Sequence, residues 1–210
     1  MELLLYFTDI VLHLDKYLLM LTQKYDQWIY AILFLIIFLE TGVVALPFLP
    51  GDSLLFVAGA LCSLGMLQIG LLMPLLMIAS FSGDNTNYWI GRTLGLKLLV
   101  DRPRLFKKEH IQRAQSFYRR HGGKTIVFAR FLPIVRTFAP FVAGIGQMQY
   151  RSFLVFSALG SMAWVSTFVV GGYFMGNIPV VKENLTLAVL VIVMVSLLPA
   201  FGRMLRQRGD

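Results

Sequence analysis

Residues 29–52 read IYAILFLIIFLETGVVALPFLPGD. Apolar residues lead into Glu40, and Pro47 and Pro50 follow before the chain reaches Asp52. Proline removes a backbone donor and crowds the preceding turn, so a helix breaks at such a pair. Broken backbone at membrane depth is tolerated only inside protein or beside a water-filled cavity. The stretch therefore predicts a discontinuous, re-entrant helix that forms a first hairpin over about 29–52.

Long uncharged stretches follow this hairpin. Residues 53–83 hold 31 residues without a charge, residues 152–181 hold 30, and residues 184–202 hold 19. A membrane-spanning helix needs about 20 apolar residues. Only 14% of the residues are charged, against about 25% in a typical soluble domain. We therefore expect an all-α polytopic membrane protein.

The order of these patterns predicts a helical bundle with two opposed re-entrant hairpins in a single membrane domain, 29–210. Apolar residues at helical spacing predict an amphipathic, interfacial helix over 1–28. The polar run GDNTN at 83–87 predicts a turn. The remaining segments are a long hydrophobic segment, a second proline-broken hairpin and two transmembrane helices, expected at 53–80, about 125–150, 152–175 and 185–202.

The positive charge is concentrated in one loop. Residues 92–124 contain ten of the 19 Lys and Arg residues, beside only Asp101 and Glu109. Such a block between hydrophobic segments predicts a cytoplasmic loop, and the basic C-terminal tail carries the same signal. We expect the block to contact anionic lipid headgroups. A nucleic-acid partner is disfavoured because no aromatic stacking module accompanies the charges.

The two proline-broken segments share two short sequence motifs in the same order. FLP at 48–50 is followed by VAG at 57–59, and FLP at 131–133 is followed by VAG at 142–144. Interrupted hydrophobic segments in corresponding halves are the best sequence pointer to a transporter's binding site. The site is therefore expected where the two broken segments meet.

Charges of opposite sign occupy the two hairpins. The first carries Glu40 and Asp52, and the second carries Arg130 and Arg136. An ionisable group at membrane depth costs about 2.5–3.5 kcal/mol, which makes each one a functional candidate. Glu40 is either a proton carrier, because burial disfavours a carboxylate, or the structural partner of an arginine. Asp52 is either a helix N-cap or a second titrating group.

The arginines of the second hairpin fit a phosphate. A guanidinium presents a planar fork of donors that matches phosphate and stays charged at any working pH. Thr137 offers a further hydroxyl donor, and the alternative for Arg130 and Arg136 is snorkelling to headgroups. Asp84 and Arg92 are weaker candidates, expected to shape the end of a loop.

Several short motifs occur together: ETG at 40–42, PxxPGD at 47–52, GD at 83–84 with Tyr88 and GR at 91–92, RxxPxxRT at 130–137 and AG at 143–144. In combination they resemble the DedA family, the bacterial branch of the SNARE-associated, VTT-domain membrane proteins. The resemblance implies two facing re-entrant hairpins in the bacterial inner membrane and an activity in lipid translocation, with undecaprenyl phosphate recycling as the leading candidate. It also implies proton dependence and a role in the cell envelope.

The leading hypothesis is a flippase-like carrier. The resemblance assigns the family's essential acids to Glu40 and Asp52 and its arginines to Arg130 and Arg136. A proton-dependent exporter of small cations or drugs and a non-transporting scaffold stay open as alternatives. We expect no enzyme activity, cofactor or metal site, since the histidines are scattered and Cys62 is the only cysteine. The residues expected to shape the hairpins are Pro47, Pro50, Gly51 and Pro133.

Overall fold

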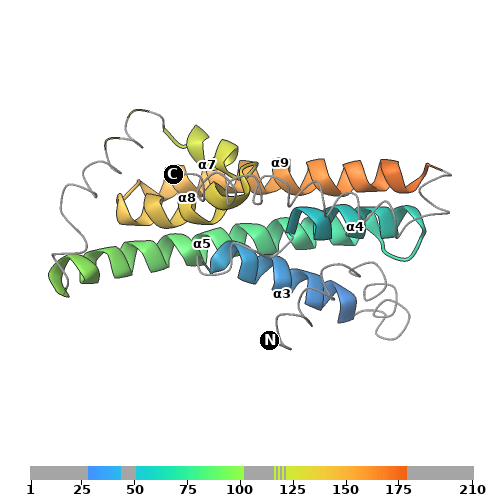
Figure 1. Ribbon diagram of the computed structural model, residues 1–210, viewed down its shortest axis with the longest axis horizontal. Helices are drawn as coiled ribbons and strands as arrows, with labels where there is room; N and C mark the ends of the chain where they lie inside the picture. The colour runs from blue at the N-terminus through green and yellow to red at the C-terminus, as the bar shows by residue number, and fades with distance from the viewer. Residues whose placement is uncertain are drawn as a thin grey trace, which may run out of the picture. The chain divides into compact units, whose positions relative to one another are not determined.

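The computed structural model describes residues 28–43, 51–101 and 122–178, with residues 116, 118 and 120; the side chains of 95–101, 133 and 134 are outside this description. Every element in these residues is a helix, which agrees with the predicted all-α class. The helices are α3 (Trp28–Gly42), α4 (Gly51–Ser63), α5 (Ile69–Asp101), α7 (Lys124–Ala129), α8 (Pro133–Ile145) and α9 (Tyr150–Gly176) (Figure 1).

Several predicted features lie outside the described residues. They are the N-terminal helix over 1–28 except for Trp28, the prolines Pro47 and Pro50, most of the basic loop 92–124, and the transmembrane helix at 185–202. The predicted helix 152–175 corresponds to α9.

The chain divides into two compact units, each described by itself. The terminal unit comprises Met1–Ile32, Pro50–Met73 and Ser166–Asp210. The central unit comprises Leu33–Leu49 and Pro74–Val165.

In the terminal unit, α4 packs directly against the end of α9. A Cβ placed on Gly59 would lie 2.1 Å from the carbonyl oxygen of Val169, and one on Gly172 would lie 2.0 Å from that of Phe56. Small residues permit this close backbone approach.

The long segment predicted at 53–80 is two helices in the structure. Helix α4 ends where Gly65 adopts φ +74°. The Gly65 amide donates to the Cys62 carbonyl at 3.1 Å, and the Met66 amide donates to the Leu61 carbonyl at 3.1 Å. This is the paired bonding of a glycine-terminated helix end. Pro74 lies inside α5.

Helix α5 is the element on which the central unit is built. A Cβ on Gly83 would lie 1.9 Å from Thr41 Oγ1 of α3, and one on Gly91 would lie 2.2 Å from the Phe141 carbonyl oxygen of α8. Because both contacts exclude any side chain, α3 and α8 dock directly on α5.

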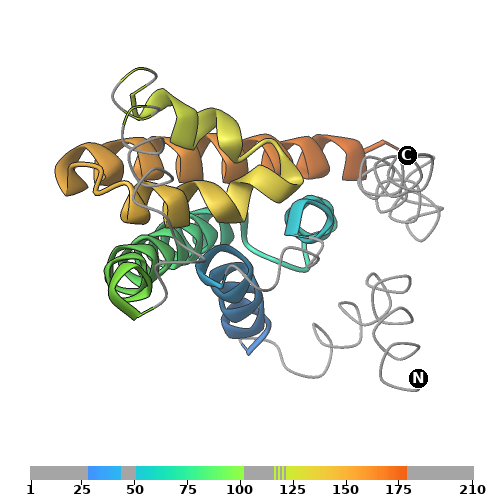
Figure 2. The same ribbon diagram turned by 60° about the vertical axis from the view of Figure 1, so that its left-hand side comes forward.

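Helices α7, α8 and the first part of α9 complete the central unit; Figures 1 and 2 both show α7 and α8 alongside α9. The rings of Tyr88 and Phe153 stack with centroids 4.4 Å apart. The Tyr88 hydroxyl donates to the Met148 carbonyl at 2.6 Å. The buried apolar cluster contains Tyr88, Tyr118, Ile126, Ala129, Ala139, Ala143 and Phe153.

The predicted turn at 83–87 is wrong, because these residues lie inside α5. Two of their polar side chains bond within the helix: the Asn85 amide donates to the Phe81 carbonyl at 2.7 Å, and the Thr86 hydroxyl donates to the Ser82 carbonyl at 3.0 Å. The others bond to neighbouring helices, as described below. Polar residues that find such partners are compatible with a helix, whatever their turn propensity.

The predicted second hairpin corresponds to α7 and α8. The two helices are separated at residues 130–132, and Pro133 occupies the start of α8. Proline fits that position because the first helical amide has no partner to lose. The break therefore lies where the sequence predicts one.

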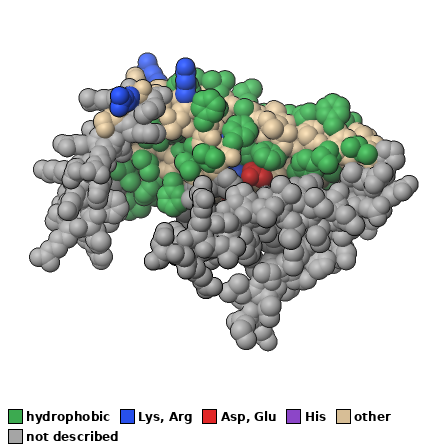
Figure 3. All heavy atoms as spheres, turned by 45° about the horizontal axis from the view of Figure 1, so that its top comes forward, with side chains coloured by type: hydrophobic (Ala, Val, Ile, Leu, Met, Phe, Trp, Pro, Cys, Tyr) green, Lys and Arg blue, Asp and Glu red, His purple; other side chains and the backbone are tan. Residues whose placement is uncertain are grey.

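The central unit exposes large apolar side chains. Figure 3 shows hydrophobic side chains over much of the described surface in view, with Lys and Arg side chains gathered toward one end. Among the described residues, α9 is the one helix long and apolar enough to cross a membrane. The exposed set includes Phe128, Phe131, Leu132, Val135 and Phe138 of the hairpin and Val155, Leu159 and Met162 of α9.

Candidate functional site

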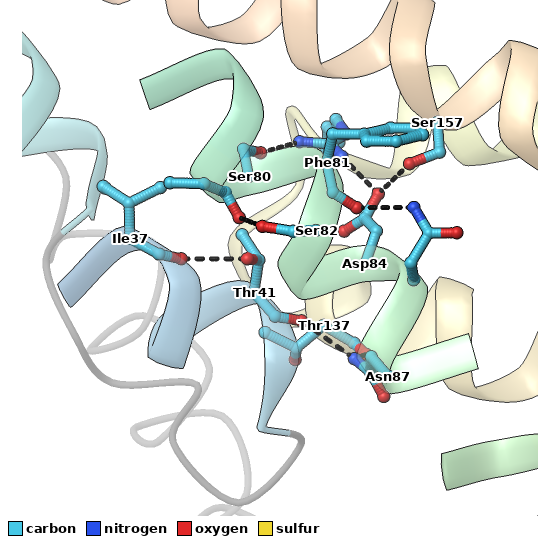
Figure 4. A network of polar contacts seen from close by, with 12 residues as sticks. Ile37, Thr41, Ser80, Phe81, Ser82, Asp84, Asn87, Thr137 and Ser157 are labelled. Atoms are coloured by element: carbon cyan, nitrogen blue, oxygen red, sulfur yellow. Dashed lines mark hydrogen bonds and ion pairs between the residues drawn. The ribbon is translucent and has the colours of Figure 1, made fainter. Parts of the chain in front are cut away.

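One buried ion pair joins α5 to the end of α7. Arg130 is the residue that caps α7, and its Nη2 donates to Asp84 Oδ2 while its Nη1 donates to Ser80 Oγ. The Ser157 hydroxyl of α9 donates to the same Asp84 oxygen at 2.7 Å. Asp84 and Arg130 are each only 2% exposed. Figure 4 shows Ser80, Asp84 and Ser157 converging from two helices.

A second buried ion pair joins α3 to α8. Arg136 Nη2 donates to Glu40 Oε1, and Glu40 has no exposed surface. Glu40 lies in the last turn of α3 and Arg136 in the first turn of α8. The structure thus brings together one acid and one arginine that the sequence analysis placed in opposite hairpins.

The Trp164 ring lies beside both guanidinium groups. Arg136 Cζ is 4.8 Å from the ring centroid and Arg130 Cζ is 6.0 Å from it. Both distances are within the range of attraction between a cation and an indole face. The two ion pairs are therefore neighbours in one buried network, which Trp164 borders.

Two glycines make room for this network. A Cβ on Gly160 of α9 would lie 2.9 Å from Arg130 Nε. Gly83 lies next to Asp84 on α5 and meets Thr41, the residue after Glu40, as described above. Larger residues at either position would displace an ion-pair helix or side chain.

Asn87 connects the α3 and α8 sides of the network. Its Nδ2 donates to the Thr41 carbonyl at 3.0 Å and to the Thr137 carbonyl at 2.7 Å (Figure 4). The Thr41 hydroxyl donates within α3 to the Ile37 carbonyl at 2.8 Å.

Three buried polar atoms here have no hydrogen-bond partner among the described residues: Arg130 Nε, Asn87 Oδ1 and Thr137 Oγ1. Most buried polar groups in proteins are satisfied by protein, water or an ion. These atoms can therefore form hydrogen bonds with a polar ligand or a water molecule. Among the described residues, no group of His, Cys, Asp and Glu has the arrangement of a metal site.

The other predicted residues have varied positions. Asp52 is the second residue of α4 in the terminal unit and is half-buried; Gly51 begins that helix. Arg92 lies within α5, where its Nη1 donates to the Tyr88 hydroxyl at 3.0 Å and its Cζ is 5.5 Å from the Trp89 ring. Since Arg92 and Asp84 lie inside a continuous helix, the expectation that they shape a loop end is wrong.

The sequence analysis did not identify four residues of the network. These residues are Ser80, Asn87, Ser157 and Trp164, none of which was assigned to the candidate site. A usable signal exists in α5: Ser80, Asp84 and Asn87 recur at three- and four-residue spacing, which places them near one face of a helix. That signal was hidden by interpreting 83–87 as a turn.

A pocket of about 350 Å³ lies elsewhere in the central unit, and no ion-pair residue lines it. Burial raises the pKa of the Tyr118 hydroxyl, which donates to the Ala139 carbonyl at 2.8 Å. The pocket is lined by Tyr118, Gly122, Gly123, Gly146, Gln147, Met148, Gln149 and Ser152.

A family model and several curated proteins match the chain. A family model described as the VTT domain matches residues 49–174. The chain is 48% identical over 211 residues to Protein DedA of Escherichia coli K12, covering 99% of this chain and 96% of that protein. It is 43% identical to an uncharacterized membrane protein of Mycobacterium leprae, over 79% of this chain and 74% of that protein. It is 38% identical to inner membrane protein YghB of Escherichia coli K12, over 82% of this chain and 80% of that protein. No solved structure matches the chain.

Proposed function

The chain belongs to the DedA family of VTT-domain membrane proteins, and from this premise we propose that it is a proton-coupled, flippase-like carrier of an anionic phospholipid-type substrate. Undecaprenyl phosphate is the proposed lipid, and its recycling would support the cell envelope. Arg130, Arg136 and Thr137 hold the phosphate in this proposal, while Glu40 and Asp52 couple its movement to protons. No covalent step is involved.

The observation that carries the proposal is the pairing of each arginine with a buried carboxylate in one network. When a carboxylate takes up a proton, its guanidinium partner becomes an uncompensated buried cation, which costs several kcal/mol. A phosphate can compensate it, because phosphate matches the guanidinium fork bidentately. A buried cation would be repelled by the same arginines. The charge pattern therefore favours an anionic substrate.

The local helix fields favour exchange at Glu40 and Arg136. A helix carries partial positive charge at its N-terminus and partial negative charge at its C-terminus. Glu40 lies in the last turn of α3 and Arg136 in the first turn of α8, so each charge lies at a helix end of its own sign. Protonation of Glu40 and arrival of an anion at the start of α8 would relieve both conflicts.

The proposed cycle alternates two partners for Arg136. With Glu40 ionised, the arginine is paired with the carboxylate and phosphate is released. With Glu40 protonated, Arg136 and the Thr137 hydroxyl bind the phosphate. External alkalinity should slow this cycle, since the carrier acid then stays deprotonated. We assign Asp52 a separate coupling or gating step from its place in the terminal unit.

The proposed membrane arrangement uses the exposed apolar side chains of α7, α8 and α9. These side chains face lipid in this arrangement, and residues 29–52 and 125–150 form the two re-entrant hairpins. The predicted loop begins too early, because residues 92–101 belong to α5. The basic segment 92–124 and the C-terminus are cytoplasmic in this arrangement, because of their basic residues. The phosphate would then pass through the bundle while the lipid tail stays in the bilayer.

The experiment is leaflet-resolved transport of labelled undecaprenyl phosphate in proteoliposomes containing the purified chain. Transport should exceed that of protein-free liposomes, respond to an imposed pH gradient, and fall in Arg136→Gln and Asp52→Asn. Arg151→Gln, which alters an exposed arginine at the start of α9, is the matched control and should transport normally. Wild-type transport equal to that of protein-free liposomes would overturn the proposal.

A proton-dependent exporter of small cations or drugs is the second candidate. One observation favours it: both arginines are buried in ion pairs, as a purely structural role would have them. Under that function Glu40 and Asp52 would exchange protons for the cation, and Arg136→Lys would keep activity. Normal lipid distribution with proton-linked cation efflux would support it. A non-transporting scaffold predicts neither activity.

A further inference from the structure

Asn87 bridges the two helices that carry the two halves of one ion pair. Its single amide group donates to a carbonyl of α3 at 3.0 Å and to a carbonyl of α8 at 2.7 Å, and the side chain has no exposed surface. Both donor hydrogens of the amide are thus used on two different helices. Because Asn87 is bonded to both helices, it fixes the distance between the end of α3 and the start of α8.

The two carbonyls are those of the residues that directly follow the ion-pair partners. Thr41 follows Glu40, and Thr137 follows Arg136. Each carbonyl lies in the peptide unit that follows Thr41 or Thr137, and because these residues are helical, fixing it restrains the turn that carries the preceding side chain. Thr41 is also among the last residues of α3, whose carbonyls lack helical partners. The Asn87 amide therefore provides a hydrogen-bond donor for the Thr41 carbonyl at the end of α3 and also fixes the position of that helix end.

The face of α5 that carries Asn87 is shaped for this junction. Gly83, Asn87 and Gly91 recur every fourth residue, so they lie along one face. Gly83 meets α3 and Gly91 meets α8 with no room for a side chain. Asn87 lies between these two crossings, and Figure 4 shows it next to Thr41 and Thr137.

We propose that Asn87 is a positioning residue that holds Glu40 of α3 opposite Arg136 of α8. Its effect on transport rests on the proposed function, but its effect on the ion pair does not. Asn87 binds no substrate in this role; it keeps the two backbones in register while the carboxylate and the guanidinium exchange partners.

A double-mutant cycle on the full-length chain in detergent or liposomes tests the pairing. Asn87→Ala should lower the melting temperature by about 2–8 °C. The same change in a Glu40→Gln background should lower it by less than half as much, since no ion pair is left to position. Equal shifts in the two backgrounds would overturn the proposal.

Asn85→Ala is the matched control. Asn85 lies two residues away on α5; its amide nitrogen donates within its own helix, and its Oδ1 accepts from the Tyr150 hydroxyl of α9 at 3.0 Å, so these bonds join it to neither α3 nor α8. Its shift should be the same in both backgrounds. If Asn87→Ala does not reach the membrane, Asn87→Ser, which keeps one donor, is used in the same cycle with the same criterion.

Transport provides the second readout. Asn87→Ala at wild-type abundance should transport about 5- to 30-fold more slowly, while Asn85→Ala should stay near wild type. A wild-type rate for Asn87→Ala would overturn the role in transport. A coupled stability cycle in a wild-type chain that moves no undecaprenyl phosphate would instead overturn the proposed function and leave the positioning role intact.

Discussion

The two buried arginine–carboxylate pairs have the same chemistry but different surroundings. Asp84 lies in the middle of the 33-residue helix α5, and Arg130 caps the C-terminal end of α7, where the helix field favours a cation. Glu40 and Arg136 lie at helix ends whose fields oppose their charges. We therefore expect the Asp84–Arg130 pair to stay closed, so that it holds the central unit together and keeps Arg130 in place for the phosphate, and we expect the Glu40–Arg136 pair to open.

The largest expected effect comes from the pair that we regard as structural. Asp84→Asn leaves Arg130 buried without its carboxylate and should reduce the free energy of unfolding by about 3–5 kcal/mol. Membrane abundance and melting temperature report it. Replacing both residues, with Arg130→Met added, should recover much of the loss. If Asp84→Asn were as stable as the wild type, the Asp84–Arg130 pair would not be the more important of the two pairs for stability.

Glu40→Gln should abolish proton-driven accumulation while reducing stability less than Asp84→Asn does. The amide cannot take up a proton, but the opposed helix field at Glu40 means that less electrostatic stabilisation is lost. Melting temperature and transport at several pH values are measured on both variants. A Glu40→Gln protein as unstable as Asp84→Asn would assign both pairs to the fold. Wild-type transport with the same pH dependence would end the proton-carrier role.

These expectations show where sequence reasoning succeeded and where it could not. The all-α class followed from uncharged runs, and the break before Pro133 followed from proline chemistry. Glu40 and Arg136 were singled out because charges at membrane depth are costly. Their contact, however, joins positions 96 residues apart, and no local pattern specifies it.

The partner of Arg130 shows the opposite outcome. The sequence analysis placed Arg130 in the hairpin opposite Glu40 and Asp52, whereas the structure pairs it with Asp84 of α5. The run GDNTN has the composition of a turn, but in the structure Asp84 and Asn87 bond to partners outside α5. Local propensity cannot include those partners, so Asn87 and Ser157 were missed for the same reason.

Arg136→Lys keeps the charge and removes the planar fork. If Arg136 binds phosphate, transport should fall about 10- to 100-fold, corresponding to about 1.5–3 kcal/mol for a charge-assisted hydrogen bond. Transport rate is compared with membrane abundance. Full activity at normal abundance would show that only the charge matters, as in a structural pair.

Trp164→Phe should have the smallest effect. The phenyl ring keeps most of the packing but attracts the two guanidinium groups less, for a loss of about 0.5–1 kcal/mol in stability. Thermal unfolding measures this loss. In an Arg136→Gln background, Trp164→Phe should reduce the free energy of unfolding by less, because one of the two cations beside the ring is then absent. An equal loss in both backgrounds would leave Trp164 with packing alone.

Proton uptake during phosphate binding tests the central claim most directly. Purified protein in weakly buffered solution is titrated with undecaprenyl phosphate while a pH indicator follows the free protons. We predict net proton uptake on binding in the wild type, little uptake in Glu40→Gln, and wild-type uptake in Arg151→Gln. Phosphate binding with no proton uptake in the wild type, or with the same uptake in Glu40→Gln, would contradict the exchange of Glu40 for phosphate at Arg136.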